Sequence, residues 1–129
     1  MSNILAQISK NPIDALRRRR NWQKMGDSLF GFSPTGTKTA TYAAEPWDLV
    51  KCNPTGGAFS VTLPAASTAT GNPIWIKNVS ASTNTITIDA DGSETIDGAT
   101  TKTITTARSS VVLLSDGTEW LVMSHWFGG

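Results

Sequence analysis

The chain has 129 residues and carries 11 Lys or Arg against 10 Asp or Glu, a net charge of +1. This length allows one globular domain with a short extension and excludes two full domains. The single cysteine, Cys52, excludes an intramolecular disulfide and a metal site built from sulfur, and no apolar run approaches the roughly 20 residues that span a bilayer.

Charge is distributed unevenly along the chain. Residues 1–24 contain six Lys or Arg and one Asp, which gives a charge of +5. Residues 25–129 contain five Lys or Arg and nine Asp or Glu, which gives a charge of −4. Charged residues are only 16% of the whole, and 18 Thr and 13 Ser supply much of the polar surface, which favours β-structure. We therefore expect the chain to consist of a basic N-terminal part and an acidic, β-rich part.

The first part, residues 1–36, is predicted to be an attachment arm that contains one short basic helix. Asn11 can cap a helix that begins at Pro12 and runs to about Lys24. Four consecutive arginines leave this helix only a narrow apolar stripe, so it needs a partner to be ordered. The side chains expected to dock on a particle are Ile4, Leu5, Ile8, Ile13, Leu16, Arg17, Arg18, Arg19, Arg20 and Trp22.

The second part, residues 37–129, shows the alternation with a period of two that β-strands give. Phe59, Val61 and Leu63, for example, alternate with Ser60 and Thr62, so each such strand is expected to bury one face. The pattern predicts an all-β fold, a small antiparallel β-sandwich or barrel-like module. The expected strands are Trp47–Cys52, Ala58–Leu63, Ile74–Asn78, Thr85–Asp89, Glu94–Ile96, Thr103–Thr106, Ser110–Leu114 and Trp120–Ser124.

One turn is especially clear in the sequence. Asp116 and Gly117 lie between the apolar runs Val111–Leu114 and Trp120–Met123. Glycine readily adopts the positive φ that a tight turn between two strands requires. We therefore expect a β-hairpin at this position.

The size of the β-module favours association. A module of about ninety residues buries only around 60–65% of its unfolded surface, and many short strands leave exposed edges. A symmetric multimer can pair or cover such edges. We expect a homotrimer built by residues 37–129.

The acidic stretch from Asp89 to Gly98 does not have the spacing of a calcium-binding loop. Counted from Asp89, glycine is at the fourth position instead of the sixth, and Thr100 is at the twelfth, where a bidentate Glu is required. We interpret the stretch as turns between strands and expect no metal. His125 is the only histidine and no nucleophile motif is present, so we expect neither an enzyme nor a cofactor.

Aromatic and basic residues are the candidates for binding. Trp75 and Trp120 lie in apolar strand patterns and are expected in the core or a subunit interface, while Trp126 and Phe127 are candidates for a second interface. The arginine run Arg17–Arg20 suits an acidic protein surface. A solvated helix face and a nucleic acid are the alternatives, and the −4 charge of the β-module argues against the nucleic acid.

Four stretches within residues 54–123 carry a family resemblance: Pro-Thr-Gly-Gly-Ala-Phe-Ser-Val-Thr-Leu-Pro-Ala-Ala, Gly-Asn-Pro-Ile-Trp-Ile-Lys-Asn, Thr-Ile-Asp-Gly, and Val-Val-Leu-Leu-Ser-Asp-Gly-Thr-Glu-Trp-Leu-Val-Met. They resemble a β-rich module that recurs in the fibres, spikes and head-decoration proteins of tailed bacteriophages. The resemblance implies a homotrimer behind a short N-terminal segment that attaches to the capsid or tail. Little chain remains for a shaft and a tip, which favours a short head fibre, capsid decoration protein or tail adaptor.

The sequence thus predicts a non-enzymatic virion structural protein that is made in the bacterial cytoplasm. Its expected partners are two further copies of itself in a homotrimer, and capsid, portal or tail proteins of the same virion. We expect no association with a membrane. The alternative is a host-receptor or carbohydrate-binding module of a tail fibre, in which Trp and Thr side chains meet a surface glycan.

Overall fold

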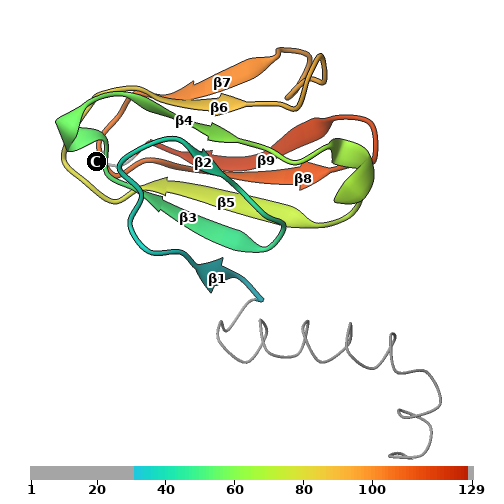
Figure 1. Ribbon diagram of the computed structural model, residues 1–129, viewed down its shortest axis with the longest axis horizontal. Helices are drawn as coiled ribbons and strands as arrows, with labels where there is room; N and C mark the ends of the chain where they lie inside the picture. The colour runs from blue at the N-terminus through green and yellow to red at the C-terminus, as the bar shows by residue number, and fades with distance from the viewer. Residues whose placement is uncertain (1–30, 128–129) are drawn as a thin grey trace, which may run out of the picture. The chain divides into compact units, whose positions relative to one another are not determined.

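The computed structural model describes residues 31–127, and these form nine strands and two short 3-10 helices (Figure 1). The predicted all-β fold is confirmed for this part of the chain, whereas the predicted basic helix lies outside the described residues. Contacts divide the chain into residues 1–33 and 34–129, and the core residues all lie in the second unit. The elements are β1 (Ser33–Pro34), β2 (Tyr42–Ala43), β3 (Asp48–Cys52), η1 (Pro54–Gly56), β4 (Phe59–Thr62), η2 (Ala66–Thr68), β5 (Pro73–Asn78), β6 (Ile86–Asp89), β7 (Thr101–Ile104), β8 (Ser110–Ser115) and β9 (Trp120–Trp126).

The strands build two mixed sheets. Sheet A has the order β1-β3-β5-β8-β9, and sheet B has the order β2-β4-β6-β7. In sheet A, β3 and β5 are parallel, and in sheet B, β2, β4 and β6 are parallel. Three other pairs, β5 with β8, β8 with β9 and β6 with β7, are antiparallel. The prediction that the module is purely antiparallel is therefore wrong.

Parallel pairing arises because the chain changes sheet after every strand from β2 to β6. Each strand therefore lies beside the strand two places further along the chain, with Leu49 next to Trp75 and Val61 next to Ile88. The chain reverses twice between such partners, so they run in the same direction. Turn residues show where the chain reverses but not which sheet the next strand joins, which explains the error.

One apolar core fills the space between the inner faces of the two sheets. Sheet A and sheet B both contribute alternate side chains that are almost fully removed from water. Burial of each large aliphatic side chain contributes about 1.5–3 kcal/mol to the free energy of folding. The buried side chains of the two inner faces therefore hold the sheets together. The main contributors are Val50, Ile74, Ile76, Leu113 and Trp120 from sheet A, and Val61, Ile86, Ile88 and Ile104 from sheet B.

The predicted hairpin is confirmed. β8 and β9 pair antiparallel across a turn in which Gly117 has a φ of 97°. Asp116 Oδ1 accepts hydrogen bonds from the backbone N–H groups of Thr118 and Glu119, both at 2.8 Å. These bonds hold the pKa of the Asp116 carboxyl below its usual value.

Two other expected strands differ from the structure. Residues 94–96 form no strand, and Ile96 makes only isolated bridges to Ala99 and Trp120. Gly92 and Asp97 have positive φ, so turns lie close to both ends of this short segment. The strand expected at Thr103–Thr106 begins and ends earlier, at Thr101–Ile104.

Candidate functional site

The outer face of sheet A is apolar. Val50, Ile76 and Leu113 point into the core, so the alternate residues of their strands point outward. Six of these outward residues lie in two rows across the sheet, are half-buried, and do not belong to the core. We call them the apolar face: Leu49, Trp75 and Val112 in one row, and Pro73, Leu114 and Leu121 in the other.

The outer face of sheet B is polar at the equivalent positions. Its strands alternate in the same way, but every outward residue in the two rows carries a hydroxyl or a carboxylate. These residues are Ser60, Thr87 and Thr103 in one row, and Thr62, Asp89 and Thr101 in the other. In these rows sheet A is thus apolar on both faces, whereas sheet B is apolar only toward the core.

The apolar face is bordered by β9, the edge strand of sheet A. Residues 95–97 cover the first half of this edge, because Trp120 N donates to Thr95 O at 2.9 Å and Val122 N donates to Asp97 Oδ1 at 3.2 Å. In the part of the chain that the structure describes, no strand covers residues 123–127, which we call the open edge.

Large apolar side chains are exposed along the open edge. Met123 is 58% exposed, Trp126 55% and Phe127 60%. Lys77 Nζ lies 4.8 Å from the centre of the Trp126 ring, and His125 packs against Phe127 with ring centres 4.7 Å apart. Exposed edge strands usually carry charges that prevent pairing with other chains, but residues 121–127 contain no Lys, Arg, Asp or Glu.

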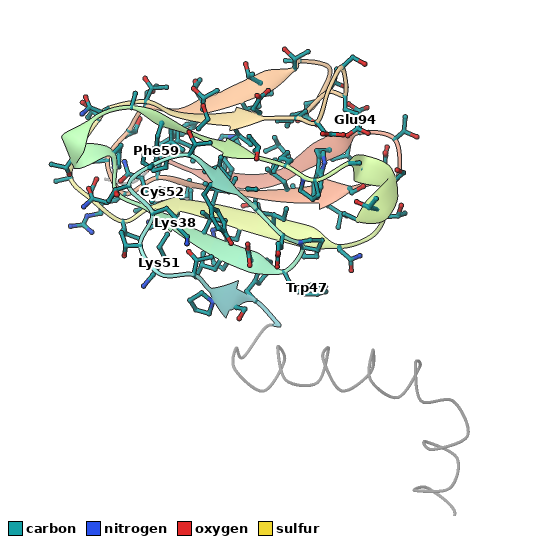
Figure 2. All side chains as sticks on the ribbon, in the orientation of Figure 1. Lys38, Trp47, Lys51, Cys52, Phe59 and Glu94 are labelled. Atoms are coloured by element: carbon teal, nitrogen blue, oxygen red, sulfur yellow. The ribbon has the colours of Figure 1, made fainter. Side chains whose placement is uncertain are left out.

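Charge is separated along the direction of the strands. β3 and β5 begin at one end of the module, where β4 and β6 finish and where the β8–β9 turn lies. All eight carboxylates within residues 34–127 lie at or near this acidic end, whereas four of the five cations lie at the opposite, basic end. Figure 2 shows Glu94 at the acidic end and Lys38 and Lys51 toward the other. The basic end carries Lys38, Lys51, Lys77 and Arg108.

Several carboxylates at the acidic end hold loops in place. Glu94 Oε1 accepts a hydrogen bond from Ala66 N at 2.9 Å, and Glu119 Oε1 accepts from Thr95 Oγ1 at 2.9 Å and from Gly98 N at 3.2 Å. Within residues 31–127, no three His, Cys, Asp or Glu side chains gather in a way that could hold a metal ion. These contacts give the carboxylates a structural role.

The single cysteine is buried in the core. Burial raises the pKa of the Cys52 thiol to about 12. Because the thiolate is the nucleophilic form, the thiol at neutral pH is unreactive. Cys52 is therefore a core residue.

The predicted site residues have different outcomes. The ten docking residues between Ile4 and Trp22 lie outside the described part of the chain. Trp126 and Phe127, predicted as a second interface, are exposed on the open edge. Trp120 is a core residue whose indole N–H donates to Pro64 O at 3.1 Å, whereas Trp75 lies on the apolar face.

Sequence reasoning did not identify the apolar face, although a signal for it is present. The runs Val111–Leu114 and Trp120–Met123 are apolar at every position, without the polar alternation of β4. Strands that are buried on both faces have this continuous apolar character. The runs therefore indicate that β8 and β9 have apolar side chains on both sides of the sheet.

Comparisons with known proteins give no family for this chain: no protein-family model matches it, and no curated protein matches it. No helix within residues 31–127 has the length and hydropathy needed to cross a membrane.

Proposed function

We propose that this chain is a structural protein of a bacteriophage virion: a short head fibre, a capsid decoration protein or a tail adaptor. In this proposal the β-module forms a homotrimer, and residues 1–36 dock onto capsid, portal or tail proteins. The protein acts by binding and has no catalytic role.

The apolar face is the observation that carries the proposal. Sheet A carries apolar side chains on its outer face as well as on its inner face, whereas the equivalent outer rows of sheet B are polar. Removal of apolar surface from water contributes about 25 cal/mol per Å², so association that covers what this face still exposes would stabilise a multimer. Self-assembly of a small β-module is what a short fibre or decoration protein requires.

Two features of the sequence support the virion assignment. The turn and strand residues between positions 54 and 123 resemble modules of bacteriophage fibres and decoration proteins. The +5 charge of residues 1–24 suits an acidic protein surface on the particle. Three arms on one trimer would bind with avidity, because the first contact raises the effective concentration of the other two.

Incorporation into particles tests the docking role. Deletion of residues 1–25 should abolish the incorporation of the protein into purified virions while the module stays folded and trimeric by light scattering. Replacement of Arg17–Arg20 with serine should weaken incorporation, and for the wild type higher salt should have the same effect, because exposed charges are screened over roughly 10 Å at 0.1 M salt. Normal incorporation of the truncated protein would contradict the proposal.

A further inference from the structure

We infer that Asp91, in the connection between β6 and β7, is the site of a spontaneous modification in which the Asp91-Gly92 step converts to isoaspartate through a cyclic imide. The sequence contains three Asp-Gly steps, at residues 91–92, 97–98 and 116–117. An aspartate cyclises most readily before glycine, because glycine has no Cβ atom to shield its backbone nitrogen. The structure distinguishes the first step from the other two, and the inference does not depend on the proposed function.

The reaction needs only the aspartate, the backbone nitrogen that follows it, and water. The nitrogen of Gly92 attacks Cγ of Asp91, so a C–N bond forms and the C–OH bond of the carboxyl group breaks. The hydroxyl group leaves with the N–H proton as one water molecule, and a five-membered succinimide ring remains. Water then opens the ring at either carbonyl group and gives aspartate or isoaspartate, so the sequence of steps consumes no oxidant and no reductant.

The attacking nitrogen is unengaged at the first step and hydrogen-bonded at the other two. Gly98 N donates a hydrogen bond to Glu119 Oε1 at 3.2 Å, and Gly117 N donates to Ser115 Oγ at 3.1 Å. Gly92 is exposed, and its N–H donates to no atom of the residues that the structure describes. Attack by either of the other nitrogens must therefore first break a hydrogen bond.

The carboxyl groups follow the same pattern. Asp97 Oδ1 accepts a hydrogen bond from Val122 N at 3.2 Å, and Asp116 Oδ1 accepts from two backbone N–H groups, both at 2.8 Å. The backbone donors hold the pKa of the Asp116 carboxyl below its usual value and favour the ionised form, which has no hydroxyl group to lose. The exposed Asp91 carboxyl accepts no hydrogen bond within residues 31–127, so it can rotate toward Gly92 N.

The product changes the β6–β7 connection. The backbone gains one carbon atom, because it then runs through Cβ and Cγ of Asp91, and the former backbone carbonyl becomes the free carboxylate. In the unmodified chain this carbonyl accepts a hydrogen bond from Glu94 N at 2.9 Å. The side chain of Glu94, labelled in Figure 2, holds Ala66 N. Isoaspartate therefore alters the turn that positions Glu94.

Ageing of the full-length protein tests the inference. The folded protein is incubated in warm, mildly acidic buffer made with heavy-oxygen water, and each opening of the ring then adds one heavy oxygen atom, whichever carbonyl group is attacked. Tryptic peptides and electron-transfer fragmentation in a mass spectrometer locate both the label and isoaspartate. Residue 91 should carry at least about ten times more label than residues 97 and 116, because the nitrogen and the carboxyl group at each of those steps must first lose their hydrogen bonds. An unlabelled residue 91, or equal labelling at the three residues, would overturn the inference.

A matched variant and an unfolded control complete the test. Asp91→Glu keeps the negative charge but would need a six-membered ring, which forms far more slowly, so the label at residue 91 should disappear while circular dichroism stays native. Urea removes the hydrogen bonds at residues 97 and 116, so the three steps should react at similar rates in the unfolded chain. A preference for residue 91 that persists unchanged in urea would show that the fold does not select this step, and the inference would be wrong.

Discussion

The phenol of Tyr42 in β2 donates a hydrogen bond of 2.8 Å to Asp48 Oδ2 in β3 and thereby ties sheet B to sheet A. The same oxygen accepts a bond of 2.9 Å from Glu45 N, and Asp48 is only 7% exposed. A buried carboxylate depends on such donors, because loss of a partner leaves its desolvation uncompensated.

The first prediction concerns this contact. Tyr42→Phe should lower the free energy of unfolding by about 1–3 kcal/mol, because the carboxylate of Asp48 loses one of its donors. Urea denaturation at fixed protein concentration measures the change. Adding Asp48→Asn completes a double-mutant cycle, and an absence of coupling between the two sites would contradict the structural role of the bond.

The second prediction uses the fact that Tyr42 is the only tyrosine. Its pKa is raised by burial, by the hydrogen bond to Asp48 and by the negative charges of Asp48 and Glu45. The folded state therefore favours the neutral phenol, and this contribution to stability is present below the unfolded pKa of about 10 and lost as pH rises above it. Tyrosinate absorbance should be absent from the native protein near pH 10. Half-ionisation at about pH 10 with native circular dichroism would contradict the prediction.

The third prediction concerns the β8–β9 turn. Gly117→Val should destabilise the module by more than about 1 kcal/mol, because a β-branched residue fits poorly at a φ of 97°. A Cβ atom there would also lie 3.1 Å from Thr70 Oγ1. Gly36→Val is the matched control, since a Cβ at Gly36 meets no atom within 4 Å. Equal melting temperatures for the two variants would show that the turn does not require glycine.

The fourth prediction concerns the thiol. With a pKa of about 12, Cys52 should react with an aromatic disulfide reagent at pH 8 far more slowly in the native protein than in urea. The rise in absorbance with time, recorded for the native protein and for the protein in urea, gives the ratio of the two reaction rates. Equal rates would mean that the core around Cys52 opens readily.

Local patterns predict the strands well but not their pairing. The alternation of Phe59, Val61 and Leu63 locates β4, and the Asp116-Gly117 pair locates a hairpin, because both signals depend on neighbouring residues. The parallel pairing of Val61 with Ile88 joins residues far apart in the chain and leaves no local signal. Residues 94–96 have strand-like composition, but Ile96 makes only isolated bridges and no continuous pairing forms.

The candidate site was only partly predictable for the same reason. Trp126 and Phe127 could be selected from their composition alone. The apolar face required knowledge that Leu49 lies beside Trp75, and the acidic end required knowledge that Glu45 and Glu119 lie at the same end of the module. Both depend on the crossings of the chain between sheets.

The alternation of the chain between the two sheets also determines an order of folding. The β8–β9 hairpin joins neighbouring strands across residues 116–119 and can form by a short loop closure. β2, β3 and β4 each pair with the strand two places further along the chain, after an intervening strand in the other sheet. Their contacts therefore carry a larger entropic cost of loop closure than those of the β8–β9 hairpin. We therefore expect the β8–β9 hairpin to form early in folding and β2, β3 and β4 to pair later. Substitutions in the β8–β9 hairpin should slow folding, whereas those in β3 should chiefly speed unfolding.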